Sequence, residues 1–285
     1  MNNGFPSAIV FDMDGVLVDT TTSYHQATLE TVRLVLAELT GVTPEATSPV
    51  DPAWIHALKS ASGFNNDWDC SAALVRVLLR PDWSALGPEA VSRRLADAGG
   101  GLTAVESLLG PEPRVNERGA VKDHFQLLYL GSSLYEAIEG RSPPRRGISG
   151  LIDTERPMAD LETLAALPVR RAIATGRPRL EAWHALDVFG LRSAFDAVVT
   201  HDDGVEAQQP GKPHPWCLLE AARRLALPPG ATCWYVGDTP DDMRAARAAG
   251  FVGIGLPASE AAGRALVAAG ASRLIERVSD LLPLR

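Results

Sequence analysis

The sequence predicts an α/β protein whose central sheet is parallel and doubly wound, with an all-α segment inserted after the first strand. Short apolar stretches alternate with helical segments over residues 160–285, which is the pattern of a parallel sheet covered on both faces. Residues 7–11 also have the character of a buried strand, yet only helical patterns follow them up to about residue 160. Because a strand needs a partner for its backbone groups, we expect residues 7–11 to join the later sheet.

The composition restricts the possible classes of protein. The chain has 285 residues, enough for two domains, and 46% of them are hydrophobic, which favours a well-filled core over disorder. The formal charge of −8 argues against a general binder of nucleic acids or of anionic membranes. Three cysteines without a framework spacing, no signal sequence and no run of about 18 apolar residues indicate a cytoplasmic protein without membrane spans. No feature of the sequence defines an oligomeric state.

Helical spacing and helix-boundary residues define the inserted segment. Apolar residues recur at helical spacing over 24–39, and Asp51-Pro52 has the form of an N-cap followed by proline at the first helical position. Further helices are expected at 67–79, 88–98, 102–109, 120–130 and 132–138. A linker rich in glycine, proline and arginine follows at 140–150. We therefore expect a helical domain over 21–159, linker included.

The remainder of the chain alternates between strands and helices. Strands are expected at 169–174, 197–200, 232–236, 251–256 and 273–275, and helices at 179–189, 216–225, 241–249, 260–269 and 278–282. Together with the first strand, these elements predict a core domain over 1–20 and 160–285. Open α/β sheets carry their sites at the carboxyl ends of the strands, so we expect the helical domain to lie above that edge.

Two aspartates follow the first strand. Asp12 and Asp14 are separated by one residue, so their side chains point the same way while strand geometry lasts, and Gly15 then permits a sharp turn. Burial and mutual repulsion both oppose the ionisation of such a pair. A bound divalent cation would offset this cost, and Mg²⁺ prefers oxygen ligands. The pair therefore indicates a metal-assisted site, with an acidic surface turn as the alternative.

Three further polar motifs follow later strands or lie in the loops at their ends. They are Thr175-Gly176-Arg177, Lys212-Pro213 and Gly237-Asp238-Thr239-Pro240-Asp241-Asp242. In a doubly wound sheet these loops meet the first aspartate pair at one edge. Acids that hold Mg²⁺, a lysine that neutralises phosphate and a carboxylate that attacks phosphorus are suited to phosphoryl transfer.

Each of these motifs also has a purely structural interpretation. Thr175 could cap the helix that follows, and Asp241-Asp242 could favour the dipole of the next helix as acids of its first turn. Lys212 could be an ordinary solvated lysine. Prolines on both sides of Lys212 stiffen its loop, however, and the context of the other motifs favours a functional role for it.

In order and context, the motifs resemble those of the haloacid dehalogenase superfamily. The matching stretches are Phe11-Asp12-Met13-Asp14-Gly15-Val16-Leu17-Val18-Asp19, Ala174-Thr175-Gly176, Gly211-Lys212-Pro213 and Gly237-Asp238-Thr239-x-x-Asp242. The helical insertion resembles that of subfamily I, whose members carry an α-helical cap. The resemblance implies a Rossmann-like core with an inserted cap, and four ordered motifs on alternating elements make it specific.

The resemblance also implies a role for each matching residue. Asp12 would be the nucleophile that forms an aspartyl-phosphate, and Asp14 would be the general acid and then the general base. Thr175 and the backbone at Gly176 would bind phosphoryl oxygens. Lys212 would bridge the phosphate and the nucleophile.

A metal site is implied in the same way. Mg²⁺ would be bound by Asp12, by the backbone carbonyl of Asp14 and by Asp238. Asp242 would support the metal through water or from outside the set of ligands, and would steady the lysine. The expected cofactor is therefore Mg²⁺.

Several individual residues restrict which subgroup of the superfamily the chain resembles. Dehalogenases lack the second aspartate, and Asp14 is present. Phosphonoacetaldehyde hydrolases also replace it and use a cap lysine, whereas the predicted cap has only Lys59 and Lys122, in ordinary settings. In β-phosphoglucomutase-like members a histidine starts the first cap helix. Here His25 follows Asp19 by six positions, one more than usual, and it could bind substrate or be exposed at a helix start.

The stretch Gly63–Asp69 mixes amides, acids and aromatic residues. It could be a substrate-specificity loop in which Asn65 binds a polar leaving group. It could equally be a turn in which Asp67 caps the next helix and Trp68 packs in the core of the cap. A further departure from many relatives is Trp216, which stands where they carry an acid after Lys-Pro-x-Pro.

These features together predict a Mg²⁺-dependent phosphatase that hydrolyses a small phosphorylated metabolite through an aspartyl-phosphate. A phosphosugar mutase of the β-phosphoglucomutase type is the first alternative, because it shares the first half-reaction. A binding protein that kept the fold and lost catalysis is the second, and the intact Asp12, Asp14, Lys212 and Asp238 argue against it. No partner other than the phosphorylated metabolite is expected.

Overall fold

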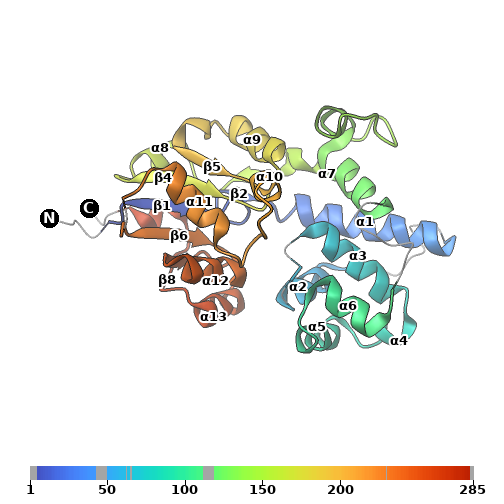
Figure 1. Ribbon diagram of the computed structural model, residues 1–285. Helices are drawn as coiled ribbons and strands as arrows, with labels where there is room; N and C mark the ends of the chain where they lie inside the picture. Colours follow the sequence, from blue (N-terminus) through green and yellow to red (C-terminus); the bar gives the residue numbers. More distant parts are fainter. Residues whose placement is uncertain are drawn as a thin grey trace. The chain divides into compact units, whose positions relative to one another are not determined.

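The chain divides into two compact units, each with its own hydrophobic core. Met1–Asp19 with Arg156–Arg285 form the core unit, and Thr20–Glu155 form the helical unit. Figure 1 shows the computed structural model of both. It describes residues 5–42, 50–61, 63–64, 66–111, 119–228 and 230–282.

A six-stranded parallel sheet forms the centre of the core unit, with strand order β5-β4-β1-β6-β7-β8 (Figure 1). The strands are β1 (Ala8–Phe11), β4 (Arg170–Ala174), β5 (Ala197–Val199), β6 (Cys233–Gly237), β7 (Val252–Gly255) and β8 (Arg273–Leu274). The chain builds outward from β1 to β5 and then returns to β6 on the other side of β1. This reversal beside β1 confirms the predicted doubly wound, Rossmann-like sheet, and such a reversal is where α/β sheets bind ligands.

Apolar side chains and helices cover both faces of this sheet. Ile9 and Phe11 pack on one face with residues of α8 (Leu161–Ala165), α9 (Arg179–Val188) and the 3₁₀ segment Val278–Leu281. Ala8 and Val10 pack on the opposite face with α11 (Trp216–Arg224) and α12 (Pro240–Ala249). Successive side chains of a strand point to opposite faces, so a strand buried on both sides is a continuous apolar run. The remaining helices of the unit are α10 (His201–Glu206) and α13 (Glu260–Ala269).

The described part of the helical unit consists mainly of helices. They are α1 (Ser23–Thr40), α2 (Pro52–Ser60), α3 (Asp67–Leu78), α4 (Pro81–Ser84), α5 (Pro88–Asp97), α6 (Gly101–Leu109) and α7 (Ala120–Glu139). The predicted N-cap is confirmed at Asp51, whose side chain accepts a hydrogen bond of 2.7 Å from the Ala53 amide. The two helices predicted at 120–130 and 132–138 are the two halves of α7, which is kinked at Gly131.

One sequence prediction about this region is wrong. No strand was expected between residue 20 and about residue 160, but Arg156–Pro157 form β3, which pairs in antiparallel fashion with β2 (Val18–Asp19). Two residues are too short to produce a periodic pattern, so this pair has no signal in the sequence. Val18 lies opposite Pro157, and the ladder joins the two places where the chain passes between the units.

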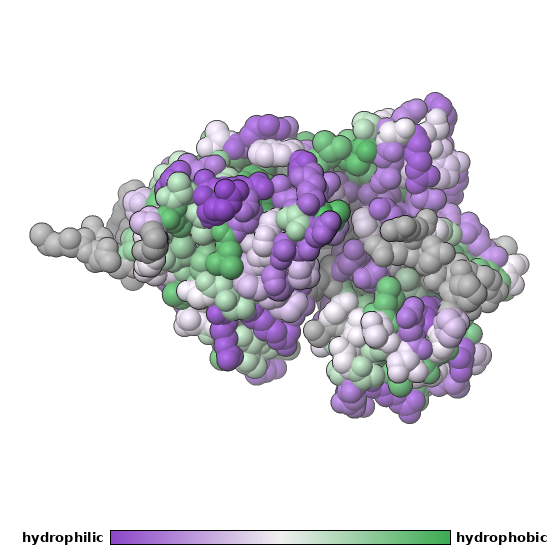
Figure 2. All heavy atoms as spheres, in the orientation of Figure 1, coloured by the Kyte–Doolittle hydropathy of each residue, from purple (hydrophilic) through white to green (hydrophobic). Residues whose placement is uncertain are grey.

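On the face seen in Figure 2, hydrophobic residues form small patches between hydrophilic ones. Over the part of the chain that the structure describes, no helix combines the length and the apolarity that a membrane span needs.

Candidate active site

A tight loop after β1 fixes Asp12. The amides of Leu17 and Val18 both donate to the carbonyl oxygen of Met13, at 2.8 and 2.9 Å, so residues 13–18 fold back on themselves. Asp12 Oδ1 accepts a hydrogen bond of 2.8 Å from the Met13 amide. Only 6% of the residue is exposed. One carboxylate oxygen is thereby held by the backbone, and the other, Oδ2, lies 2.8 Å from the ammonium group of Lys212.

The sheet register brings the other motifs to the same level. Phe11 lies opposite Ile173 of β4 and Val236 of β6. The residues just beyond these three positions therefore emerge side by side at the carboxyl edge of the sheet. They include Asp12, Thr175 and Asp238.

Two glycines allow the acids to approach one another. Gly15 has φ +70°, and a Cβ atom there would lie 2.2 Å from Asp238 Oδ2. A Cβ atom on Gly237 would lie 2.4 Å from the Cβ atom of Asp242. Any side chain at either position would push an acid away, so glycine is needed at both for steric reasons and at Gly15 also for its backbone conformation.

Lys212 connects two of these acids. Its Nζ atom lies 2.8 Å from Asp12 Oδ2 and 2.7 Å from Asp242 Oδ1. The lysine side chain is 12% exposed and the Asp242 side chain is fully buried. Lys212 is therefore not a solvated lysine, because its ammonium group bridges two buried carboxylates.

Tyr235 of β6 joins the same network, and the sequence analysis did not identify it. Its hydroxyl accepts a hydrogen bond of 3.1 Å from Lys212 Nζ and can donate to Asp242 Oδ1 at 3.1 Å or to the Ala174 carbonyl oxygen at 3.3 Å. It thus contacts three of the four motif regions. The available signal was a phenol inside an otherwise apolar strand, which is weak because buried tyrosines often serve only packing.

The charges of this cluster shift the pKa values of its members. Burial raises the pKa of Asp12 to about 7, against the opposing effect of Lys212. Burial alone would lower the pKa of Lys212, but Asp12 and Asp242 raise it well above its ordinary value. Burial also opposes ionisation of Asp242, yet Lys212 and the hydrogen bonds from Thr239 lower its pKa. The lysine therefore carries its charge, and one positive charge serves two buried carboxylates.

A cation fits this arrangement. Carboxylate oxygens of Asp12, Asp238 and Asp242 all lie within 4.8 Å of one another. An all-oxygen set of this kind suits a hard divalent cation such as Mg²⁺. A cation there would also offset the cost that raises the pKa of Asp12. The donor set thus fits the predicted metal, with Asp242 in the cluster itself; the contribution of the Asp14 carbonyl remains a prediction.

Asp242 combines a structural role with this position. Its Oδ2 atom accepts hydrogen bonds from the amide and hydroxyl of Thr239, at 2.9 and 2.6 Å, in a capping box that begins α12. Its Oδ1 atom faces Lys212 and Tyr235. Asp241 forms an ion pair with Arg244 in the same helical turn. The interpretation of Asp242 as only a first-turn acid is therefore wrong.

Thr175 is buried, and Gly176 beside it is exposed. The hydroxyl oxygen of Thr175 accepts a hydrogen bond of 3.0 Å from the Arg177 amide. Helix α9 begins later, at Arg179, with Pro178 at the N-cap and no side-chain hydrogen bond there. The alternative that Thr175 caps the following helix is thus wrong, and its proposed role in binding phosphoryl oxygens stays a prediction.

The sequence prediction left Arg177 without a role, although it follows Thr175-Gly176 directly. Its guanidinium group is buried and forms an ion pair with Asp14. The carboxylate of Asp14 is therefore held by Arg177 and does not join the cluster of the other three aspartates.

The candidate residues of the helical unit lie elsewhere in the chain and are described by themselves. His25 is on α1, where its ring contacts the ring of His56 edge to face at 5.1 Å. Asn65 lies outside the described residues. The N-cap of α3 is Asn66, whose side chain accepts hydrogen bonds from the amides of Trp68 and Asp69, so the proposed cap at Asp67 is wrong.

Both lysines of the helical unit also have specific partners. Lys59 forms an ion pair of 3.0 Å with Asp67, and Lys122 lies over the ring of Trp68 at 4.1 Å. In the core unit, Trp216 is the first residue of α11 and packs partly buried against the hydrophobic cluster on that face of the sheet.

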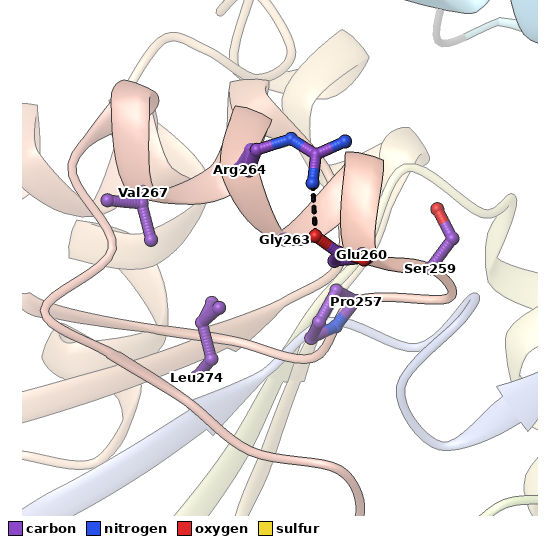
Figure 3. Close-up of a pocket in the computed structure, with 7 residues that line it drawn as sticks. All are labelled: Pro257, Ser259, Glu260, Gly263, Arg264, Val267 and Leu274. Carbon is purple, nitrogen blue, oxygen red and sulfur yellow. Dashed lines mark hydrogen bonds and ion pairs between the residues drawn. The ribbon is translucent and has the colours of Figure 1, made fainter.

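A shallow groove of about 390 Å³ lies on another part of the core unit, between α13 and β8 (Figure 3). Pro257, Val267 and Leu274 give it an apolar lining, and Glu260 and Arg264 pair at its edge. None of the residues of the acid–lysine cluster lines this groove. Its lining offers no group suited to phosphoryl transfer.

Comparison with known proteins gives three informative relatives. The chain is 26% identical over 253 residues to an imidazoleglycerol-phosphate dehydratase of Phytophthora nicotianae, which covers 87% of this chain and 43% of that protein. It is 30% identical over 125 residues to phosphoglycolate phosphatase of Escherichia coli. This matched stretch is 43% of the present chain and 48% of that protein. The chain thus spans less than half the length of these two relatives.

A solved structure resembles the chain over most of its length. This is phosphatase Tt82 from Thermococcus thioreducens, with a TM-score of 0.58 and 28% sequence identity over 84% of this chain and 86% of that one. The model of the haloacid dehalogenase-like hydrolases matches residues 6–250. That match includes all four motifs and the acid–lysine cluster built from them. The chain therefore belongs to the haloacid dehalogenase-like hydrolase family.

Proposed function

We propose that the chain is a Mg²⁺-dependent phosphatase that hydrolyses a small phosphorylated metabolite through an aspartyl-phosphate. The observation that carries the proposal is the contact of Lys212 Nζ with Asp12 Oδ2 at 2.8 Å, next to the carboxylates of Asp238 and Asp242. A carboxylate beside an ammonium group and a cation site is arranged for attack on a phosphate dianion, because its charge is compensated. Relatives named as phosphatases support the same activity.

In the first half-reaction, the Asp12 carboxylate attacks phosphorus and forms a new O–P bond. The bond between phosphorus and the substrate oxygen breaks, and Asp14 gives a proton to the departing alcohol. Lys212 holds the nucleophile and a phosphoryl oxygen together. In this proposal the hydroxyl of Thr175 and the backbone at Gly176 bind the remaining phosphoryl oxygens.

In the second half-reaction, Asp14 takes a proton from water, and the water oxygen attacks phosphorus. The bond to Asp12 breaks, which releases inorganic phosphate and restores the carboxylate. Asp12, Asp238 and Asp242 would hold Mg²⁺, which supplies charge neutralisation of the phosphoryl oxygens. The substrate of the chain is a phosphate monoester in this proposal.

The proposal is tested by phosphate release from a panel of phosphorylated metabolites, with Mg²⁺ or with EDTA. We expect release that needs Mg²⁺ and that falls at least about 1,000-fold in Asp12→Asn, because that variant lacks the nucleophile. Asp187→Asn on α9 is the matched control, since Asp187 is exposed and pairs with Arg192.

Four outcomes of this assay would contradict the proposal. Wild-type release that persists in Asp12→Asn would exclude the nucleophile, and release that persists in EDTA would exclude the metal. Isomerised hexose phosphate in place of free phosphate would identify a mutase. Background release from wild type and variant alike would favour a binding protein.

A further inference from the structure

Arg177 is a fully buried cation that the proposed reaction has not yet used. No part of its side chain is exposed, whereas the side chain of its partner Asp14 is 31% exposed. A buried guanidinium group is costly unless it is paired. Asp14 is one of the groups that compensate it, and Asp14 has a proposed part in the chemistry, which gives the contact a candidate role beyond folding.

The hydrogen bonds between the two residues are asymmetric. Arg177 Nε and Nη2 both donate to the same atom, Asp14 Oδ1, at 3.0 and 2.5 Å. An arginine often binds one carboxylate oxygen with each arm of its fork. In this contact, Asp14 Oδ2 accepts no hydrogen bond from the described residues, and the partial exposure of the side chain is consistent with an open second oxygen.

We propose that Arg177 is a positioning residue, which fixes Asp14 by Oδ1 so that Oδ2 is the atom that gives and takes the proton. A proton on Oδ1 would point at two N–H donors, so the open oxygen is the one that can carry it. The double contact also prevents rotation of the carboxylate, and a fixed donor is worth more to catalysis than a mobile one. The inference rests on the proposed function, because it assigns a partner to its general acid.

Arg177 is not placed to bind the substrate phosphate itself. Its guanidinium group is enclosed in protein and donates to Asp14. A purely structural ion pair is the competing explanation. The two explanations differ in one respect: only a positioning role should depend on how much the leaving group needs a proton.

The test compares two leaving groups in Arg177→Gln and Arg177→Lys. We expect kcat/KM for an alkyl phosphate to fall about 100-fold in Arg177→Gln, because alkoxides must be protonated as they depart. For para-nitrophenyl phosphate, whose phenolate leaves without a proton, we expect a loss of less than about 10-fold. Arg177→Lys, which keeps the charge but not the fork, should fall between wild type and Arg177→Gln. Equal losses on both substrates would overturn the proposal.

Arg179→Gln is the matched control. Arg179 is two positions away, its side chain is 39% exposed, and it pairs with Asp203 and Glu206. We expect Arg179→Gln to have a small effect on kcat/KM, and the same effect for the alkyl phosphate as for para-nitrophenyl phosphate.

A second measurement covers the case in which a variant folds poorly or the enzyme proves inactive. If Arg177→Gln does not fold, Arg177→Lys and the wild type carry the leaving-group comparison. If the wild type hydrolyses no phosphate ester, the proposed function fails. The contact between Arg177 and Asp14 is then tested by the melting temperatures of Arg177→Lys, Asp14→Asn and the double variant. If the double variant loses less in melting temperature than the sum of the two single losses, Arg177 holds Asp14. Additive losses would show that Arg177 does not hold Asp14.

Discussion

The two units of the chain differ in how completely their buried polar groups are paired. In the core unit, Asp12, Lys212, Asp242 and Tyr235 contact one another at 3.1 Å or less. In the helical unit, several buried hydroxyls have no hydrogen-bond partner among the described residues; they belong to Thr28, Thr31, Ser71 and Tyr135. An unpaired buried hydroxyl costs about 1–3 kcal/mol. The comparison teaches that polar burial in the core unit is organised around one site. In the helical unit, Ser23 and Tyr129 both donate to Glu155, but the four unpaired hydroxyls lie outside that group and lower stability.

Among the comparisons between the two units, the largest effect is expected from two glycines with the same backbone conformation, one in each unit. Gly15 has φ +70° and Gly41 has φ +71°. A Cβ atom on Gly15 would lie 2.2 Å from Asp238 Oδ2, whereas a Cβ atom on Gly41 would meet none of the residues that the structure describes. Alanine at Gly15 displaces an acid of the proposed metal site, so we expect activity to fall about 100-fold or more. We also expect Mg²⁺ to raise the melting temperature less than in the wild type.

Alanine at Gly41 is the control for backbone strain. It should cost about 1 kcal/mol of stability and leave activity unchanged. Activity, and the change of melting temperature with added Mg²⁺, are measured for both variants. Equal effects of the two substitutions would mean that strain, and not the position of Asp238, explains the loss.

Two buried tyrosines give the second comparison. The Tyr235 hydroxyl contacts Lys212 and Asp242, whereas the Tyr135 hydroxyl has no hydrogen-bond partner within the described chain. We expect Tyr235→Phe to lower kcat about 10-fold. The variant removes one of the contacts that fix the position of Lys212, and the proposed reaction depends on that position. Tyr135→Phe should leave kcat unchanged and keep or raise the melting temperature. Steady-state kinetics and thermal unfolding of both variants check this, and an unchanged kcat in Tyr235→Phe would remove that residue from the site.

The core site could be predicted from the sequence because its residues obey short, fixed spacings. Asp12 and Asp14 are tied to the end of one strand, and the acids around Asp238 are tied to the end of another. Sheet topology then brings these ends together, so the prediction needs no knowledge of side-chain packing. Lys212 followed from its order in the chain relative to those motifs.

Tyr235 and Arg177 could not be predicted in the same way. The role of Tyr235 depends on how far its ring reaches across β6 toward Lys212, and the role of Arg177 on a contact with a residue 163 positions earlier. Neither contact leaves a periodic signal.

Helix boundaries in the helical unit were also difficult to predict. The capping residue of α3 was placed one position late, at Asp67 instead of Asn66, because both side chains are suited to that position.

The third comparison concerns ion pairs of different burial and their dependence on pH. Arg224 of α11 contacts Asp203 at 2.8 Å and Glu220 at 2.9 Å. Burial would raise the pKa of Asp203, but the hydrogen bonds of Arg224 and Thr200 lower it to about 2. The hydrogen bonds of Arg223 and Arg224 lower the pKa of Glu220 to about 2 as well. Because the pKa values are lower in the folded state, this stabilisation is complete above the ordinary carboxyl range and is lost as pH falls toward 2.

Arg224→Met should therefore cost about 1–2 kcal/mol at pH 7 and progressively less as the pH falls below about 4. Urea unfolding of wild type and variant at pH 7, 5 and 3 measures the difference. Arg264→Met is the control, because the pair of Arg264 with Glu260 is exposed and should contribute little at any pH. A cost that does not change with pH would show that Arg224 acts through packing and through its hydrogen bond of 2.6 Å to the Val198 carbonyl oxygen, instead of through the two carboxylates.

The smallest expected effect is a gain, and it belongs to the helical unit. Ser71 on α3 is buried, and its hydroxyl has no hydrogen-bond partner in the described part of the chain. Ser71→Ala removes the unpaired group without leaving a large cavity, so we expect the free energy of unfolding to rise by about 1 kcal/mol. Ser23 is the matched control, since its buried hydroxyl donates to Glu155 Oε1 at 3.0 Å. Ser23→Ala leaves that acceptor with one donor fewer and should lower the free energy of unfolding by a similar amount. If Ser71→Ala also lowers the free energy of unfolding, the Ser71 hydroxyl has a favourable partner. The unpaired hydroxyls that distinguish the helical unit would then be those of Thr28, Thr31 and Tyr135.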